Sequence, residues 1–191
     1  HEHEGDEAES EEPEQDEHIW LSLRNAEVCT QAIADQLKKL DPSNKTEYED
    51  NEIAYKEELT GLDKGYQDTV DHAKRKTLLF ADRFPFRYLA DDYGLKYYAA
   101  FKGCSAETEA SFKTITFLAN KVDEENLPYV MTIEGSDQKI AKSVISNTKK
   151  KTQQIMTMDS MQSTTSQDVK DGKSYLSVME ENLSVLQKAL N

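Results

Sequence analysis

The 191-residue sequence lacks several features that would assign it to a common functional class. It contains no run of about 18 consecutive apolar residues, so it offers no candidate for a membrane-spanning helix. No Gly-rich segment has the spacing of a P-loop or a dinucleotide-binding fingerprint, which argues against nucleotide binding through those motifs. The two cysteines, Cys29 and Cys104, permit a disulfide without implying one. We expect Cys29 to be a small buried residue of a helix.

Basic clusters are also missing, and the strong negative charge is confined to one end of the chain. The formal net charge is −14, and residues 1–17 contain ten of the acidic residues with no lysine or arginine. Removing these ten charges leaves −4 for the rest of the chain, which is an ordinary surface charge. Because no basic stripe is present, nucleic acid is not an expected partner.

The acidic tract at residues 1–17 has the composition of a flexible, solvated loop, because it is highly charged and nearly free of apolar residues. His1 and His3 lie among its carboxylates, a mixture that can also collect divalent cations weakly. The chain opens inside this tract without an initiator methionine, so we expect a fragment or a processed form of a longer protein.

Two helices are predicted after the tract. Ser22 can cap the first, and the segment Asp41-Pro42-Ser43 ends it. The second is predicted from 45 to 74, with a length of about 45 Å, which exceeds what a small domain needs for its own core. The first helix has apolar residues at spacings of three and four, namely Ala26, Cys29, Ile33, Leu37 and Leu40.

From residue 76 onward, short apolar strands alternate with helical segments. Helical crossovers between such strands predict an α/β fold: a single lobe with a four-stranded parallel sheet flanked by helices and preceded by the long helix. The predicted strands are 77–81, 97–101, 129–134 and 153–158, and the predicted helices are 85–93, 107–125, 136–148 and 173–190. The expected divisions are 1–17 (acidic loop), 18–44 (first helix region), 45–75 (long helix) and 76–191 (α/β lobe).

Candidate ligand-binding residues are expected where the parallel strands end. Asp159 follows the last predicted strand directly, and Cys104 and Glu107 follow the second. His18 lies beside the apolar triplet Ile19-Trp20-Leu21. An imidazole, a carboxylate and a thiolate or second carboxylate suit a borderline cation such as zinc. On spacing alone, Asp159 could instead be a helix cap or turn residue, and His18 could be structural.

Two other groups of residues have plainer explanations than a ligand site. Asp82 and Arg83 could face a ligand, but a salt bridge that fixes the turn between strand and helix is favoured. Ser105 beside Cys104 could suggest a nucleophile. The histidines outside the acidic tract lie in no catalytic pattern, so catalysis is not expected.

Several segments, taken in order, form a pattern shared with one protein family. Residues 16–22 read Asp-Glu-His-Ile-Trp-Leu-Ser, similar to an Asp-Pro-His-hydrophobic-Trp-Leu motif. Residues 80–88 and 103–109 look like second-lobe segments of one branch, and 158–161 with 175–179 resemble a last strand and final helix. The chain from Asp16 to Asn191 thus resembles the solute-binding proteins of zinc and manganese ABC transporters.

The resemblance implies two α/β lobes joined by one long rigid linker helix, with a metal held in the cleft between them. The 45–74 helix matches the linker, and residues 1–17 look like the remnant of the acidic, His-bearing loop of zinc-handling members. The family's motif histidine and the carboxylate after its last strand are metal ligands, and they fall on His18 and Asp159.

This chain departs from the family pattern in two places. The family's first lobe, which supplies one histidine, has no counterpart here. A third ligand is expected after the strand ending at Phe101, where this chain offers Cys104, with Glu107 as second choice. Cys104 could equally be structural. A thiolate ligand would favour Zn²⁺ over Mn²⁺, because manganese prefers oxygen ligands.

The function expected from the resemblance is non-enzymatic. The chain would be the C-terminal part of an extracytoplasmic protein, anchored to the membrane through a preceding segment. It would capture a divalent metal, with zinc favoured over manganese, and deliver it to an ABC transporter permease. The alternative is a free-standing α/β interaction module in which His18 and Asp159 are structural.

Overall fold

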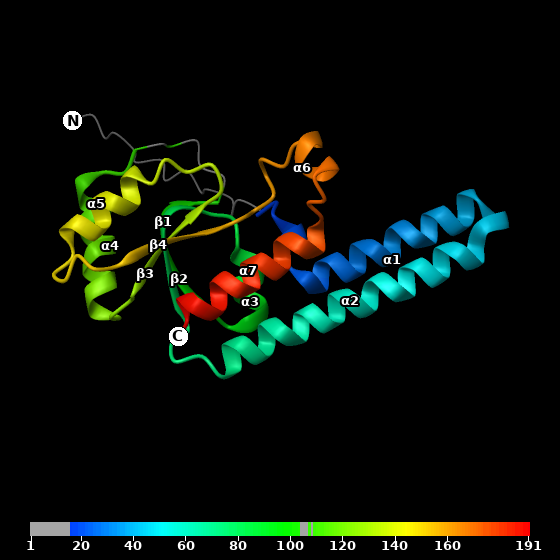
Figure 1. Cartoon of the computed structure of the whole chain (residues 1–191), viewed down its shortest axis with the longest axis horizontal. Coiled ribbons are helices and arrows are strands. Elements are labelled where there is room, and N and C mark those ends of the chain that lie inside the picture. Colours follow the sequence, from blue (N-terminus) through cyan, green and yellow to red (C-terminus); the bar gives the residue numbers. More distant parts are fainter. Residues whose placement is uncertain (1–15, 104–106, 108) are drawn as a thin grey trace, which may run out of the picture.

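The computed structural model describes residues 16–103, 107 and 109–191. Figure 1 shows an α/β body at one end and a helical hairpin that extends away from it. The residues at positions 1, 3 and 104, which carry three of the predicted metal-binding groups, lie outside the described residues. Within the described residues, no helix combines the length and the apolar character needed to cross a membrane.

The hairpin consists of two long antiparallel helices. Ser22 caps the first as predicted, because its side-chain oxygen accepts a hydrogen bond from the Asn25 backbone N–H at 3.0 Å. Polar pairs join the helices, such as Lys38 with Glu52 at 3.0 Å. The second helix ends three residues earlier than predicted and is about 40 Å long. The elements are η1 (Ile19–Leu21), α1 (Leu23–Leu40), η2 (Pro42–Asn44) and α2 (Lys45–Asp71).

In the described residues the sheet has four strands, all parallel, in the order β2-β1-β3-β4. This confirms the predicted α/β class. The predicted end of the first strand at residue 81 is wrong. A register shift between Phe80 and Arg83 lets the strand resume pairing with its neighbour through Phe84. The strands are β1 (Thr77–Phe84), β2 (Lys96–Lys102), β3 (Tyr129–Ile133) and β4 (Gln154–Met158).

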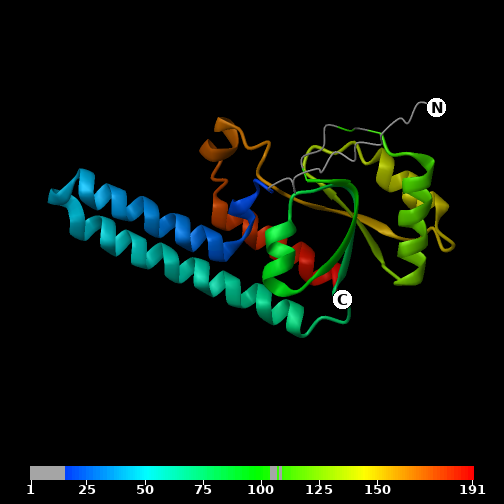
Figure 2. The same ribbon diagram turned by 180° about the vertical axis from the view of Figure 1, so that it is seen from behind.

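Helices cover both faces of the sheet. Alternate residues of β1 enter two buried clusters. Phe80 belongs to the cluster that includes Met179 of the last helix, and Leu79 belongs to the cluster that includes Leu118 and Val144. Figure 2 shows the molecule from behind, with α4 and α5 (green and yellow) together on the side of the sheet away from the hairpin. The helices are α3 (Arg87–Tyr93), α4 (Phe112–Glu124), α5 (Lys139–Asn147), α6 (Ser166–Lys170) and α7 (Tyr175–Ala189).

Helix α7 joins the hairpin to the body. The Tyr66 hydroxyl of α2, fully buried, donates a 2.6 Å hydrogen bond to the Met179 carbonyl of α7. Gly65 permits the close approach of these helices, since a Cβ there would lie 3.1 Å from Leu183 Cδ2. Helix α7 therefore fixes the hairpin to the α/β body. The same helix borders the edge of the sheet at which the strands end.

One face of α1 is apolar and exposed. Ile33, Leu37 and Leu40 are 61%, 39% and 80% exposed. Cys29, on the same side of the helix, is also exposed, so the prediction that it is buried is wrong. The apolar spacing predicted the helix correctly, but only its first turns pack against the body.

Candidate metal centre

Acidic residues follow two adjacent strands at the carboxyl edge of the sheet. Ile133, the last residue of β3, pairs with Met158, the last residue of β4. Glu134 and Asp159 are the next residues in the chain, so they leave the sheet side by side. Asp159 was predicted to lie at this edge, whereas Glu134 was not singled out. The predicted strand 129–134 includes Glu134, whereas β3 ends at Ile133, so the signal of an acid directly after a strand was missed.

His18 is held by a carboxylate in a geometry that suits a metal ligand. Its side chain is 2% exposed, and its Nδ1 lies 2.7 Å from Asp16 Oδ1. An ionised carboxylate can only accept, so Nδ1 carries the hydrogen and the lone pair of the neutral ring is on Nε2. A carboxylate paired with one ring nitrogen is the arrangement that orients histidines in zinc sites.

Asp16 is itself fixed by two further hydrogen bonds. The His18 backbone N–H donates to Asp16 Oδ1 at 3.0 Å, and the Tyr88 hydroxyl of α3 donates to the Asp16 carbonyl at 2.8 Å. The orientation of the His18 ring thus depends on a short turn attached to the α/β body.

Trp20 places the segment that carries His18 beside the segment that carries Asp159. Its ring centroid lies 5.3 Å from that of His18, and its Nε1 donates a 3.0 Å hydrogen bond to the Ser160 carbonyl. The Tyr175 hydroxyl of α7 donates to the Trp20 carbonyl at 2.7 Å. Two segments about 140 residues apart therefore meet at one place, beside the start of α7.

The Asp159 backbone and side chain are both held in place. The buried Asn182 side chain of α7 accepts from the Asp159 N–H and donates to its carbonyl, each at 2.8 Å. Asp159 Oδ1 accepts from the Met161 N–H at 2.7 Å, and Oδ2 lies 2.7 Å from Lys173 Nζ. The hydrogen bond to Asp159 raises the pKa of the Lys173 ammonium above its usual value.

Glu134 is tied to the turn after β4. One of its carboxylate oxygens accepts from the Ser160 hydroxyl at 2.7 Å and from the Gln162 N–H at 3.1 Å, and the other accepts from the Ser160 N–H at 2.8 Å. These bonds hold the turn that contains Asp159 against the end of β3.

Asp82 and Arg83 form the predicted salt bridge, but they lie within β1 and not in the turn between strand and helix, where the prediction placed them. Arg83 Nε lies 3.8 Å from Asp82 Oδ1, which also accepts from the Arg83 N–H at 2.8 Å. The other Asp82 oxygen accepts from the Ile133 N–H at 3.3 Å, and the side chain is largely buried. The pair therefore links the ends of β1 and β3.

Glu107 is exposed and lies outside any helix, because α4 begins at Phe112 after its Ser111 cap. The predicted helix start at 107 is thus wrong. Over residues 16–103, 107 and 109–191, no group of three or more His, Cys, Asp or Glu side chains is arranged to hold a metal ion.

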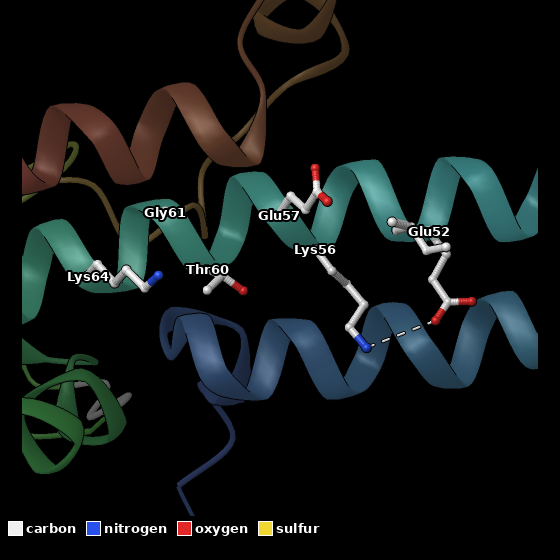
Figure 3. A pocket seen from close by; sticks show the side chains of 7 residues that line it. Glu52, Lys56, Glu57, Thr60, Gly61 and Lys64 are labelled. Carbon is white, nitrogen blue, oxygen red and sulfur yellow. Dashed lines mark ion pairs between the residues drawn. The ribbon is translucent and has the colours of Figure 1, made fainter.

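A shallow open groove of about 430 Å³ lies on the hairpin, away from the strand ends. Figure 3 shows its side chains, with Lys56 directed toward Glu52, whose Oε1 lies 4.0 Å from Lys56 Nζ. The groove follows one helix and carries acidic and basic groups in near balance, so its size alone does not mark it as the ligand site. Its lining residues are Glu52, Ile53, Lys56, Glu57, Thr60, Gly61 and Lys64.

Residues 1–189 match the model of a family described as ZnuA, zinc-uptake complex component A, periplasmic. The zinc-binding lipoprotein AdcA of Streptococcus pneumoniae serotype 4 is 35% identical over 173 residues, covering 91% of this chain and 34% of that protein. The high-affinity zinc uptake system protein ZnuA of Bacillus subtilis strain 168 is 32% identical over 175 residues, covering 92% of this chain and 53% of that protein. The chain thus spans about a third to a half of the length of these relatives.

Solved structures agree with the sequence comparisons. The Zn(II)-bound ZnuA-like domain of S. pneumoniae AdcA superposes with a TM-score of 0.74 at 32% identity, covering 92% of this chain and 64% of that one. The metal-dependent lipoprotein YcdH of B. subtilis gives a TM-score of 0.79 at 29% identity, covering 92% and 65%. The resemblance inferred from the motifs is confirmed, and the chain belongs to the ZnuA family of zinc-uptake components.

Proposed function

We propose that this chain is the C-terminal part of an extracytoplasmic protein that captures zinc and delivers it to an ABC transporter permease. The observation that carries the proposal is the Asp16–His18 pair, which turns a ring nitrogen into a suitable metal ligand beside the turn that holds Asp159. The names of the relatives, a zinc-binding lipoprotein and a zinc uptake system protein, support the same cargo and location. Membrane anchoring would come from a segment that precedes this chain, and no enzymatic step is proposed.

In this proposal His18 Nε2 and Asp159 Oδ2 are two of the ligands. Asp16 and Asn182 position them without contacting the metal. Cys104 and Glu107 remain the candidates for a third ligand, and a thiolate would favour Zn²⁺ over the alternative Mn²⁺. Because imidazole binds zinc only when neutral, capture should weaken at acid pH.

The proposed divisions are an acidic loop (1–17), a first helix region (18–44), a linker helix (45–75) and a metal-binding lobe (76–191). His1 and His3 would let the acidic loop collect metal weakly.

We further propose that a preceding N-terminal lobe covers the apolar face of α1. The exposed residues Ile33, Leu37 and Leu40 support this, as does the share of 64–65% that the chain covers in the two solved relatives. Amide hydrogen exchange tests it: α1 should exchange more slowly in a protein that includes the preceding region. Equal amide exchange rates of α1 in the two proteins would contradict the proposal that a preceding lobe covers this face.

Calorimetry with ZnCl₂ tests the site itself. A His1→Ala/His3→Ala version of the chain removes the histidines of the acidic loop, and we expect it to bind zinc in the micromolar range or more weakly, since part of the ligand set lies elsewhere. Nanomolar binding contradicts the expectation of an incomplete site.

Variants then separate this function from an interaction module. In the same background, His18→Ala with Asp159→Ala should abolish the remaining binding. His72→Ala with Asp171→Ala, a matched pair of the same residue types, should leave it unchanged. Unchanged binding in the first double variant favours the module.

A further inference from the structure

Lys173 forms an ion pair with the candidate ligand Asp159. Its Nζ lies 2.7 Å from Asp159 Oδ2, and the two side chains are 27% and 23% exposed. The lysine immediately precedes Ser174, which caps α7, so it stands at the far end of the loop that begins with Asp159. The ion pair therefore closes this loop on itself.

Both partners are positioned by other contacts. Asp159 is held by Asn182 and by the Met161 N–H, which leaves Oδ2 directed at the lysine. The Lys173 backbone N–H donates to the Asp168 carbonyl at 2.9 Å. Asp168 and Glu134 add negative charge near the Lys173 ammonium, so the surroundings of Asp159 Oδ2 favour a cation.

A metal ion and the ammonium group would compete for this oxygen. Zinc binds carboxylate oxygen at about 2.0–2.2 Å, so a bound dication would face the ammonium across a few ångströms. Like charges at that separation repel, and the long lysine stem allows the ammonium to move toward solvent.

We propose that Lys173 is a built-in counter-ion that competes with zinc for Asp159 and swings away when the metal binds. This inference rests on the proposed function and deepens it, because it names a residue that sets the affinity of the same site. In the metal-free protein the lysine neutralises the carboxylate and keeps the loop closed. Zinc must displace it, which lowers the apparent affinity.

The test is calorimetric titration of ZnCl₂ into the His1→Ala/His3→Ala chain with and without Lys173→Met. Methionine keeps an unbranched stem of similar length and removes the charge. We expect affinity to rise roughly three- to tenfold, from the loss of a partly exposed ion pair and of the repulsion. Lys170→Met, with the same charge change on α6, should have less than a twofold effect. Equal or weaker binding by Lys173→Met overturns the inference.

Thermal unfolding separates competition from a purely structural salt bridge. A competing lysine stabilises only the metal-free protein, so Lys173→Met should lower its Tm by about 1–3 °C, while the zinc-saturated Tm stays unchanged or rises slightly as the repulsion is lost. Equal lowering of both Tm values overturns the inference.

A failure of the proposed function can be told apart from a failure of the counter-ion inference. If His18→Ala and Asp159→Ala leave zinc binding intact, the site is elsewhere. If both weaken it while Lys173→Met changes nothing, only the counter-ion inference is lost.

Discussion

Asn182→Ala should reveal how strongly the fold holds Asp159 in place. The asparagine is 2% exposed and makes two hydrogen bonds of 2.8 Å with the Asp159 backbone. Each such bond contributes about 1–1.5 kcal/mol net, and both backbone groups lose their partner in the variant. Loss of the pair should therefore lower the free energy of unfolding by about 2–3 kcal/mol. For a chain of this size that corresponds to a fall in Tm of about 4–12 °C.

Urea denaturation followed by circular dichroism measures this loss, with Asn147→Ala as the control. Asn147 is exposed at the end of α5 and bonds only within its own helix, to the Ser143 carbonyl. Its replacement should change stability by less than about 0.5 kcal/mol. Zinc affinity should fall in Asn182→Ala and not in the control. If Asn182→Ala unfolds at the same urea concentration as the unaltered chain, the two hydrogen bonds of Asn182 do not hold Asp159 in solution.

Further substitutions test separate parts of the structure. Asp16→Asn should weaken zinc binding by about 10–100-fold in calorimetry while the metal-free Tm stays within a few degrees, because it removes the carboxylate that orients His18; an unchanged affinity would count against the ring assignment. Tyr66→Phe should cost about 1 kcal/mol of unfolding free energy through its lost bond to Met179, and an unchanged urea midpoint would argue against that bond. Leu118→Ala should cost about 2–5 kcal/mol, because its buried side chain fills the core between α4 and the sheet. Cys29→Ser should leave the urea midpoint unchanged, since the thiol is exposed; a loss above about 0.5 kcal/mol would indicate that Cys29 is buried in solution.

Local sequence signals predicted most of the fold. The Ser22 cap and the strand–helix alternation are short-range features, and the structure has the predicted capped helix and parallel sheet. Helix starts were less accurate. Glu107 was assigned to a helix whose actual cap is Ser111, because no packing information marks the first turn. The extension of β1 through Phe84 depends on pairing with β2, which local propensity does not contain.

Burial was predicted poorly for apolar side chains that no other described residue covers. The spacing of Ile33 and Leu37 predicts an apolar helix face correctly, yet none of the residues that the structure describes covers it. Similarly, Phe112 stands at the start of α4 and is 76% exposed. Periodicity tells which residues share a face, but not what that face meets.

At the candidate site, the sequence indicated Asp159 but not its surroundings. Asn182 and Lys173 follow Asp159 only after a loop whose path cannot be predicted from the local sequence. Their contacts with Asp159 therefore have no local sequence signature. Asp16 could have been recognised, since it lies two residues from His18 within the quoted motif.

Helix α7 connects three parts of the molecule within 15 residues: Tyr175 bonds to Trp20, Met179 receives Tyr66, and Asn182 holds Asp159. A displacement of the Asp159 turn would therefore tilt α7 and, with it, the hairpin. Over the roughly 40 Å length of α2, a tilt of about 5° moves the distal end by about 3.5 Å. A spectroscopic label on a cysteine introduced at exposed Ser43, in the turn at the distal end of the hairpin, with Cys29→Ser, would register such a movement. Its absence on zinc addition would show that the hairpin does not move with α7. If α7 and the hairpin move as one rigid body, a small displacement at the strand ends would be larger at the distal end of the protruding helices.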